Sequence, residues 1–176
     1  MKAADFADVA AQLVAAVPDG LPAGTTPPAG VGLAVHAPGV DIRAAAGHRG
    51  IDGDGSGRLP LTVDTHHDIA SVTKIICTTT ALLRLVSEEL VDLDDEVRRY
   101  LPGFIGGDKS TVTVRQLLLH RAGLWEWQPL YAAVGEPGDA LELVQRLPLR
   151  YRADAARHYS DLGFMLLGEI VSLATG

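Results

Sequence analysis

Two side chains of complementary chemistry lie one helical turn apart in the stretch HHDIASVTKIICTTTALLRLV, residues 66–86. Ser71 carries a hydroxyl, and Lys74, one of only three lysines in the chain, follows it three residues later. Residues at positions i and i+3 of a helix share one face, so the amine can reach the hydroxyl. At a helix start, free backbone N–H groups and the positive end of the helix dipole also lie near the serine. The spacing predicts a nucleophile and its activating amine, as used in acyl transfer.

The same two residues also fit a purely structural interpretation. Ser71 can cap the helix that follows it, and Lys74 can be a solvent-facing side chain. A serine and a lysine at this spacing arise by chance in roughly one chain in ten of such composition. The pair by itself therefore leaves both interpretations open.

Two later stretches add to this pattern: LLLHRAGL, residues 117–124, and YSDLGFMLLG, residues 159–168. With SVTK at 71–74 they make the chain, from about residue 31 to residue 176, resemble the serine β-lactamase and penicillin-binding protein-like superfamily. The resemblance is to the class C and esterase-type branch. Its members show S-x-x-K at a helix start, a stretch like LLTHTSGL, and Y-x-N before a helix that reads LLG.

The resemblance implies a role for each matching residue. Ser71 would be the acyl-accepting nucleophile, Lys74 would help to remove its proton, and Tyr159 would be the general base. This chemistry needs Tyr159 close to Lys74, because a cation lowers the pKa of a phenol. A half-buried tyrosine bonded to backbone is the structural alternative. Trp125 and Trp127 would lie near the mouth of the cleft, where they line an apolar acyl pocket or serve ordinary packing.

Asp161 stands where the Y-x-N motif has asparagine. An amide donates a hydrogen bond to a substrate carbonyl, whereas an ionised carboxylate only accepts one. A carboxylate here would also pair with Lys74, raise its pKa and repel an anionic substrate such as a β-lactam. We therefore expect Asp161 to contact the substrate of an esterase or peptidase-like enzyme, one that prefers neutral or amine-bearing substrates. The structural alternative for Asp161 is a cap for the last helix.

The family's third motif, a K-T-G or H-x-G triad on a later strand, does not follow the tyrosine motif, because the sequence ends at Gly176. In the family that strand completes the sheet and supplies one oxyanion-hole N–H. Loss of one such donor typically costs about two to three orders of magnitude in rate. We therefore expect the N-terminal portion of a longer hydrolase, weak or inactive by itself, and completed by a C-terminal segment or a second chain. A non-catalytic, penicillin-binding-like sensor or binding module is the alternative.

The elements that must position these residues give an α+β fold of the β-lactamase/transpeptidase type without its C-terminal strands. Residues 1–60 hold an amphipathic helix at 3–17, stopped at Pro18, and two antiparallel strands at 31–37 and 40–47. Glycine-rich connectors follow the helix and the second strand. Residues 61–176 form a mostly helical part, with helices from 71 to about 90, at 114–120, at 138–147 and from about 160. We predict one incomplete domain over 1–176.

Composition excludes several classes of protein. The net charge of −7 argues against a nucleic-acid partner, and no apolar run approaches the length of a membrane span. The N-terminus lacks the apolar core of a signal peptide, so the default expectation is a cytoplasmic protein. His66, His67 and His120 fit no metal-binding spacing and are expected to be structural, with His120 hydrogen-bonded to backbone. The expected partner is a small ester, amide or β-lactam-like substrate, with no cofactor.

Overall fold

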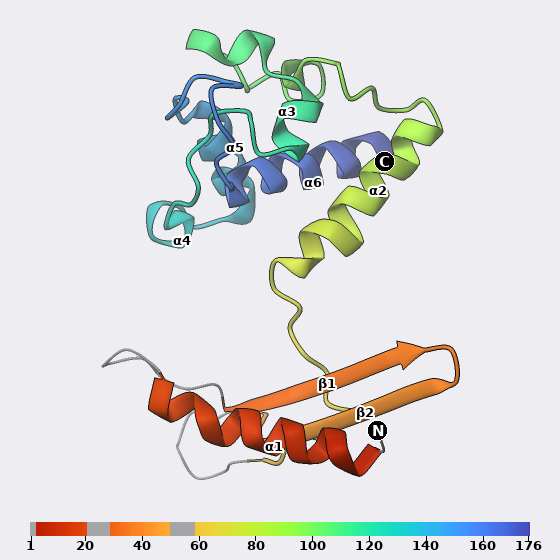
Figure 1. The fold of residues 1–176 in the computed structure, drawn as a ribbon. Coiled ribbons are helices and arrows are strands. Elements are labelled where there is room, and N and C mark those ends of the chain that lie inside the picture. Colours follow the sequence, from red (N-terminus) through yellow and green to blue (C-terminus); the bar gives the residue numbers. More distant parts are fainter. Residues whose placement is uncertain (1–2, 21–28, 50–58) are drawn as a thin grey trace. The chain divides into compact units, whose positions relative to one another are not determined.

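The computed structural model describes residues 3–20, 29–49 and 59–176, which form two compact units, 1–68 and 69–176. In the first unit, helix α1 (Ala3–Gly20) packs along a hairpin of strands β1 (Gly30–Ala37) and β2 (Val40–Gly47) (Figure 1). The strands are antiparallel and joined by a two-residue turn, in which Gly39 adopts a φ of 75° that other residues rarely take. This unit matches the predicted helix and two strands.

Two details of the first unit differ from the prediction or lie beyond it. The helix continues to Gly20 instead of stopping at Pro18. The glycine-rich connectors lie largely outside the described residues, at 21–28 and 50–58.

The second unit is helical, as predicted, and includes short elements that the sequence pattern did not indicate. Its longest helix is the last one, which packs against the helices that precede it in the chain (Figure 1). The short α4 and η3 were not predicted, because four or five residues are too few to show a periodic pattern. The elements are η1 (Lys74–Thr79), α2 (Thr80–Ser87), η2 (Val97–Arg99), η3 (Gly107–Thr111), α3 (Val114–Leu118), α4 (Leu130–Ala133), α5 (Pro137–Arg146) and α6 (Asp161–Thr175).

The helix that follows Ser71 begins with a widened, π-helical stretch, η1. Two threonine hydroxyls accompany this winding: Thr79 donates to the carbonyl of Lys74 at 2.8 Å, and Thr80 donates to that of Ile75 at 3.1 Å. Each hydroxyl bonds a carbonyl five residues back, which fits the π spacing and is typical of functional sites. The wide turn lies directly after the predicted nucleophile.

The core of the second unit is one apolar cluster centred on α6. Leu166, Leu167 and Ile170 of α6 are fully buried, together with Leu82 of α2 and Phe104. Truncation of a fully buried leucine to alanine typically costs about 2–5 kcal/mol, so this cluster holds α6 firmly against its neighbours. The α+β fold class is confirmed. Among the described residues, no helix is long and apolar enough to cross a bilayer.

Candidate active site

Ser71 lies in a turn at the entrance to the η1 helix, after Ala70, whose φ of 44° is unusual for a residue with a side chain. The Lys74 ammonium donates a hydrogen bond to the Ser71 hydroxyl over 3.1 Å. The side chain of Lys74 is only 16% exposed. Lys74 is therefore not the solvent-facing residue of the structural alternative, and its amine is directed at the serine.

Tyr159 and Asp161 reach the same ammonium group from the start of α6. Asp161 Oδ1 is buried and lies 2.7 Å from Lys74 Nζ. The Tyr159 ring centroid is 5.1 Å from Lys74 Nζ, and the pKa of its phenol responds to both Ser71 and Lys74. The structure thus brings together a hydroxyl, an amine, a phenol and a carboxylate from two segments about 85 residues apart in the sequence.

The charges at this site favour a proton on the lysine and disfavour one on the phenol. Burial lowers the pKa of Lys74, but the hydrogen bonds and negative charges of Asp161 and Tyr159 outweigh it, so the net pKa lies above its ordinary value. Hydrogen bonds with Ser71 and then with Lys74 lower the pKa of the Tyr159 phenol, against a weaker opposing effect of burial. The expectation that Asp161 opposes a neutral Lys74 is confirmed.

The loop before Tyr159 is held in place by the backbone that follows the LLLH stretch. The Gly123 carbonyl accepts the N–H groups of Arg150 at 2.9 Å and Tyr151 at 3.0 Å. Gly123 has a φ of 80°, and a β-carbon there would collide with the Tyr151 carbonyl. Only glycine meets both conditions, so the glycine of the HRAG sequence keeps the two segments in close contact.

The start of α6 is fixed from the same side. The buried Ser160 hydroxyl caps the helix by accepting the Gly163 N–H at 3.1 Å, and it donates to the Trp125 carbonyl at 2.6 Å. The Glu126 carbonyl accepts the Asp161 N–H at 2.8 Å. The cap that was considered for Asp161 therefore belongs to Ser160, which leaves the Asp161 carboxylate free to pair with Lys74.

The two tryptophans lie in different surroundings. The Trp125 indole donates to the Pro148 carbonyl at 3.2 Å and lies under the Arg150 guanidinium, 4.7 Å from the ring centroid. This arrangement matches the packing alternative for Trp125, and its contact with substrate stays a prediction. Trp127 is 54% exposed and lies beside Tyr131, with ring centroids 6.4 Å apart.

His120 is a site residue whose importance the sequence pattern understated. Its expected hydrogen bond to backbone is confirmed, since Nδ1 accepts the Ser160 N–H at 3.0 Å. The bond fixes the segment next to Tyr159, about 40 residues further along the chain. A polar residue at the end of the apolar run LLL was the available signal.

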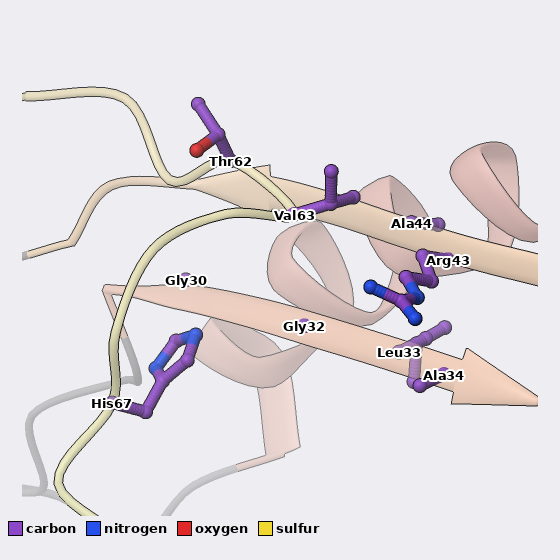
Figure 2. A pocket seen from close by; sticks show the side chains of 9 residues that line it. All are labelled: Gly30, Gly32, Leu33, Ala34, Arg43, Ala44, Thr62, Val63 and His67. Atoms are coloured by element: carbon purple, nitrogen blue, oxygen red, sulfur yellow. The ribbon is translucent and has the colours of Figure 1, made fainter.

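A separate hollow lies in the first unit, on the β1–β2 sheet beside the segment 62–67 (Figure 2). The His67 ring lies near Gly32, where a β-carbon would be 3.6 Å from Nε2, and its structural role stays a prediction. Within the described ranges, no group of three or more histidine, cysteine, aspartate or glutamate side chains is arranged to hold a metal ion.

Comparison with known proteins agrees with the geometry. The Beta-lactamase family model matches residues 14–176. The chain belongs to the Beta-lactamase family. A solved class C β-lactamase has a TM-score of 0.76 at 20% sequence identity, covering 100% of this chain and 46% of that one. Similarity at this level shows a shared fold.

Two curated relatives of this Beta-lactamase-family chain come from well-known bacteria. A putative D-alanyl-D-alanine carboxypeptidase of Escherichia coli (strain K12) is 36% identical over 131 residues, 67% of this chain and 30% of that protein. An N-acetylmuramyl-L-alanine amidase of Bacillus subtilis (strain 168) is 38% identical over 125 residues, 64% of this chain and 28% of that protein. The matched region thus spans under a third of either relative.

Proposed function

We propose that this chain carries the acyl-transfer centre of a serine hydrolase, with Ser71 as nucleophile. The observation that carries the proposal is the grouping of Ser71, Lys74 and Tyr159, with Lys74 Nζ 3.1 Å from Ser71 Oγ and 5.1 Å from the Tyr159 ring centroid. A nucleophilic hydroxyl needs a base within hydrogen-bond reach, and that base needs a third group to orient it. The Tyr159 phenol and the Lys74 ammonium meet these two requirements.

In the proposed reaction Tyr159 takes the proton of Ser71 as Oγ attacks the substrate carbonyl carbon. Lys74 stays protonated because Asp161 lies 2.7 Å away, and its charge stabilises the phenolate form of Tyr159. The tetrahedral intermediate collapses when the bond to the leaving group breaks, and Tyr159 returns its proton to that group. Tyr159 then takes a proton from water as the water oxygen attacks the carbonyl carbon of the Ser71 ester. It gives that proton to Ser71 Oγ as the bond to the acyl group breaks and the acid is released.

The proposed substrates are small esters or amides that are neutral or carry an amine, as opposed to anionic β-lactams. Asp161 supports this choice, because its side chain is 41% exposed and places a negative charge beside the nucleophile. The name of one curated relative, an amidase, supports an amide-cleaving alternative to an esterase.

The test is covalent labelling of Ser71 by a fluorophosphonate, measured as the mass gain of the intact protein. We expect a single adduct that maps to Ser71 and is absent in Ser71→Ala. No adduct, or an adduct that persists in Ser71→Ala, contradicts the proposal. For the substrate class, hydrolysis of a short-chain p-nitrophenyl ester should exceed that of nitrocefin, and faster nitrocefin cleavage contradicts the preference for neutral substrates.

The second candidate is a binding module that keeps the fold without turnover. The Lys74–Asp161 ion pair favours it, because a permanently protonated lysine cannot itself act as a base. Saturable binding of a penicillin or ester ligand without any mass gain would support this candidate, whereas an acyl adduct on Ser71 would exclude it.

A further inference from the structure

We propose that His120 is a positioning residue that clamps Tyr159 in its working orientation, and that protonation of the His120 imidazole releases the clamp. The kinetic consequence of this inference rests on the proposed function above. His120 lies in the turn after α3, and its ring is almost completely buried, at 7% exposure. It contacts Tyr159 and the residue on each side of it.

Three separate contacts make up the clamp. The His120 carbonyl accepts the His158 N–H at 2.9 Å. The ring nitrogen Nδ1 accepts the Ser160 N–H at 3.0 Å. Between these two bonds, the imidazole lies against the Tyr159 ring, with centroids 4.5 Å apart, and against Phe164 at 4.9 Å. A tyrosine held at its backbone on both sides and along its ring cannot easily swing away from Ser71.

The end of α3 fixes the backbone of His120. Its φ of 57° is the left-handed conformation that commonly follows a helix, with the His120 N–H bonded to the Leu117 carbonyl at 3.0 Å and the Arg121 N–H to the Gln116 carbonyl at 2.7 Å. The carbonyl and the ring nitrogen of His120 accept hydrogen bonds from two backbone N–H groups, those of His158 and Ser160, which are two positions apart in the chain.

The clamp requires a neutral imidazole. Because Nδ1 accepts the Ser160 N–H, the neutral ring carries its proton on Nε2. A protonated ring has N–H on both nitrogens, so it would face the Ser160 N–H with a second donor. The unpaired amide and the added charge would then push Ser160 and its neighbour Tyr159 away from the ring.

The charged groups around the ring keep it neutral at ordinary pH. Burial, followed by the positive charges of Arg157 and Lys74, lowers the pKa of His120 below 6.5, while the negative charge of Asp161 acts weakly in the other direction. The fourth titratable group that faces the imidazole is the Tyr159 phenol, whose ring lies 4.5 Å away between centroids. Since the folded state disfavours protonation, the stabilising effect of neutral His120 is present above pH 6.5 and is lost as pH falls through the lowered pKa.

The first experiment needs no activity. In ¹⁵N-labelled protein, the Ser160 amide resonance and the His120 ring resonances should shift with the same midpoint, below pH 6.5, and the Ser160 amide should resist hydrogen exchange only above that midpoint. A Ser160 amide that does not respond as the His120 ring titrates overturns the inference. If the clamp is observed but the fluorophosphonate leaves Ser71 unmodified, the proposed function fails and the clamp stands.

The second experiment compares fluorophosphonate labelling rates of His120→Asn and His120→Ala. Asparagine tolerates a left-handed backbone, offers an acceptor oxygen near the position of Nδ1 and does not titrate. At neutral pH we expect His120→Asn to be labelled within a few-fold of wild type, and His120→Ala roughly tenfold or more slowly. The ratio of the wild-type rate to the His120→Asn rate should fall as pH drops through the His120 midpoint.

A matched control uses the neighbouring histidine. The His158 ring stacks on Tyr151 at 3.6 Å and does not bond Ser160, so His158→Asn should keep the wild-type pH dependence. A pH-independent ratio for His120→Asn, or wild-type labelling by a folded His120→Ala, overturns the inference.

Discussion

The carboxylate of Asp161 is the feature whose removal tests the proposed selectivity most directly. Asp161→Asn replaces a charge 2.7 Å from Lys74 with a neutral amide of the same shape. Because the carboxylate is 41% exposed and already shared with Lys74, we take an effective dielectric constant of about 40–80. At about 6 Å, its repulsion of a substrate carboxylate is then about 0.7–1.4 kcal/mol. Removal of this repulsion corresponds to a rate gain of about three- to tenfold.

The assay is the acylation rate of Ser71 with an anionic penicillin and with a neutral p-nitrophenyl ester, both followed by intact mass. We expect Asp161→Asn to raise the ratio of penicillin rate to ester rate by about three- to tenfold. Loss of the partly exposed ion pair should cost about 1 kcal/mol of unfolding free energy or less. The rate ratio cancels any general loss of active protein.

Glu142→Gln is the matched control for this change. Glu142 pairs with Arg146 on the exposed face of α5, so its loss removes one negative charge without touching the site. The reasoning is refuted if Asp161→Asn leaves the rate ratio unchanged or lowers it, or if Glu142→Gln changes it equally.

Three further changes test the site and its support. Ser71→Ala should abolish labelling with little effect on stability, because only the attacking oxygen is lost. Lys109 is buried, and its ammonium donates to the Gln145 carbonyl at 2.6 Å, so Lys109→Met should cost about 1–3 kcal/mol in urea unfolding by leaving that carbonyl unpaired. Gly123→Ala should destabilise the fold by more than about 1 kcal/mol and slow Ser71 labelling, because its β-carbon strikes the facing backbone.

These outcomes have simple controls. Ser87→Ala removes a serine hydroxyl at the end of α2, away from the site, and should leave labelling intact. Gly138→Ala adds a β-carbon where nothing lies within 4 Å, so it should not destabilise the fold as Gly123→Ala does. Labelling in Ser71→Ala, or wild-type stability in Lys109→Met or Gly123→Ala, would contradict the corresponding prediction.

Local patterns predicted most of the secondary structure. Alternating and helical spacing located α1, both strands and α6, because burial of one face imposes these periods on the sequence. The π-helical winding of η1 was not predicted, because the sequence pattern does not show which backbone carbonyls the Thr79 and Thr80 hydroxyls bond. The single domain over 1–176 stays a prediction. The structure divides into two compact units, with the boundary in the sequence between residues 68 and 69.

The candidate site was predicted in part. The sequence placed Ser71 and Lys74 together through their helical spacing, and the resemblance to a family added Tyr159. It did not indicate that Ser160 takes the helix cap, or that the carbonyl groups of Trp125 and Glu126 fix the start of α6. Backbone carbonyls are present at every residue, so no residue type marks the ones that a distant loop will bond.

The sequence by itself determined that Ser71 and Lys74 lie close together, since a separation of three residues at a helix start brings the amine within reach of the hydroxyl. Only the tertiary structure decided which other side chains contact this pair. Packing of α6 against η1 and α2 carries Asp161 and Tyr159 to the Lys74 ammonium, and the His120 turn fixes their position. Contacts between segments distant in the chain depend on the whole core, and those contacts also shift the pKa of the lysine upward and that of the phenol downward.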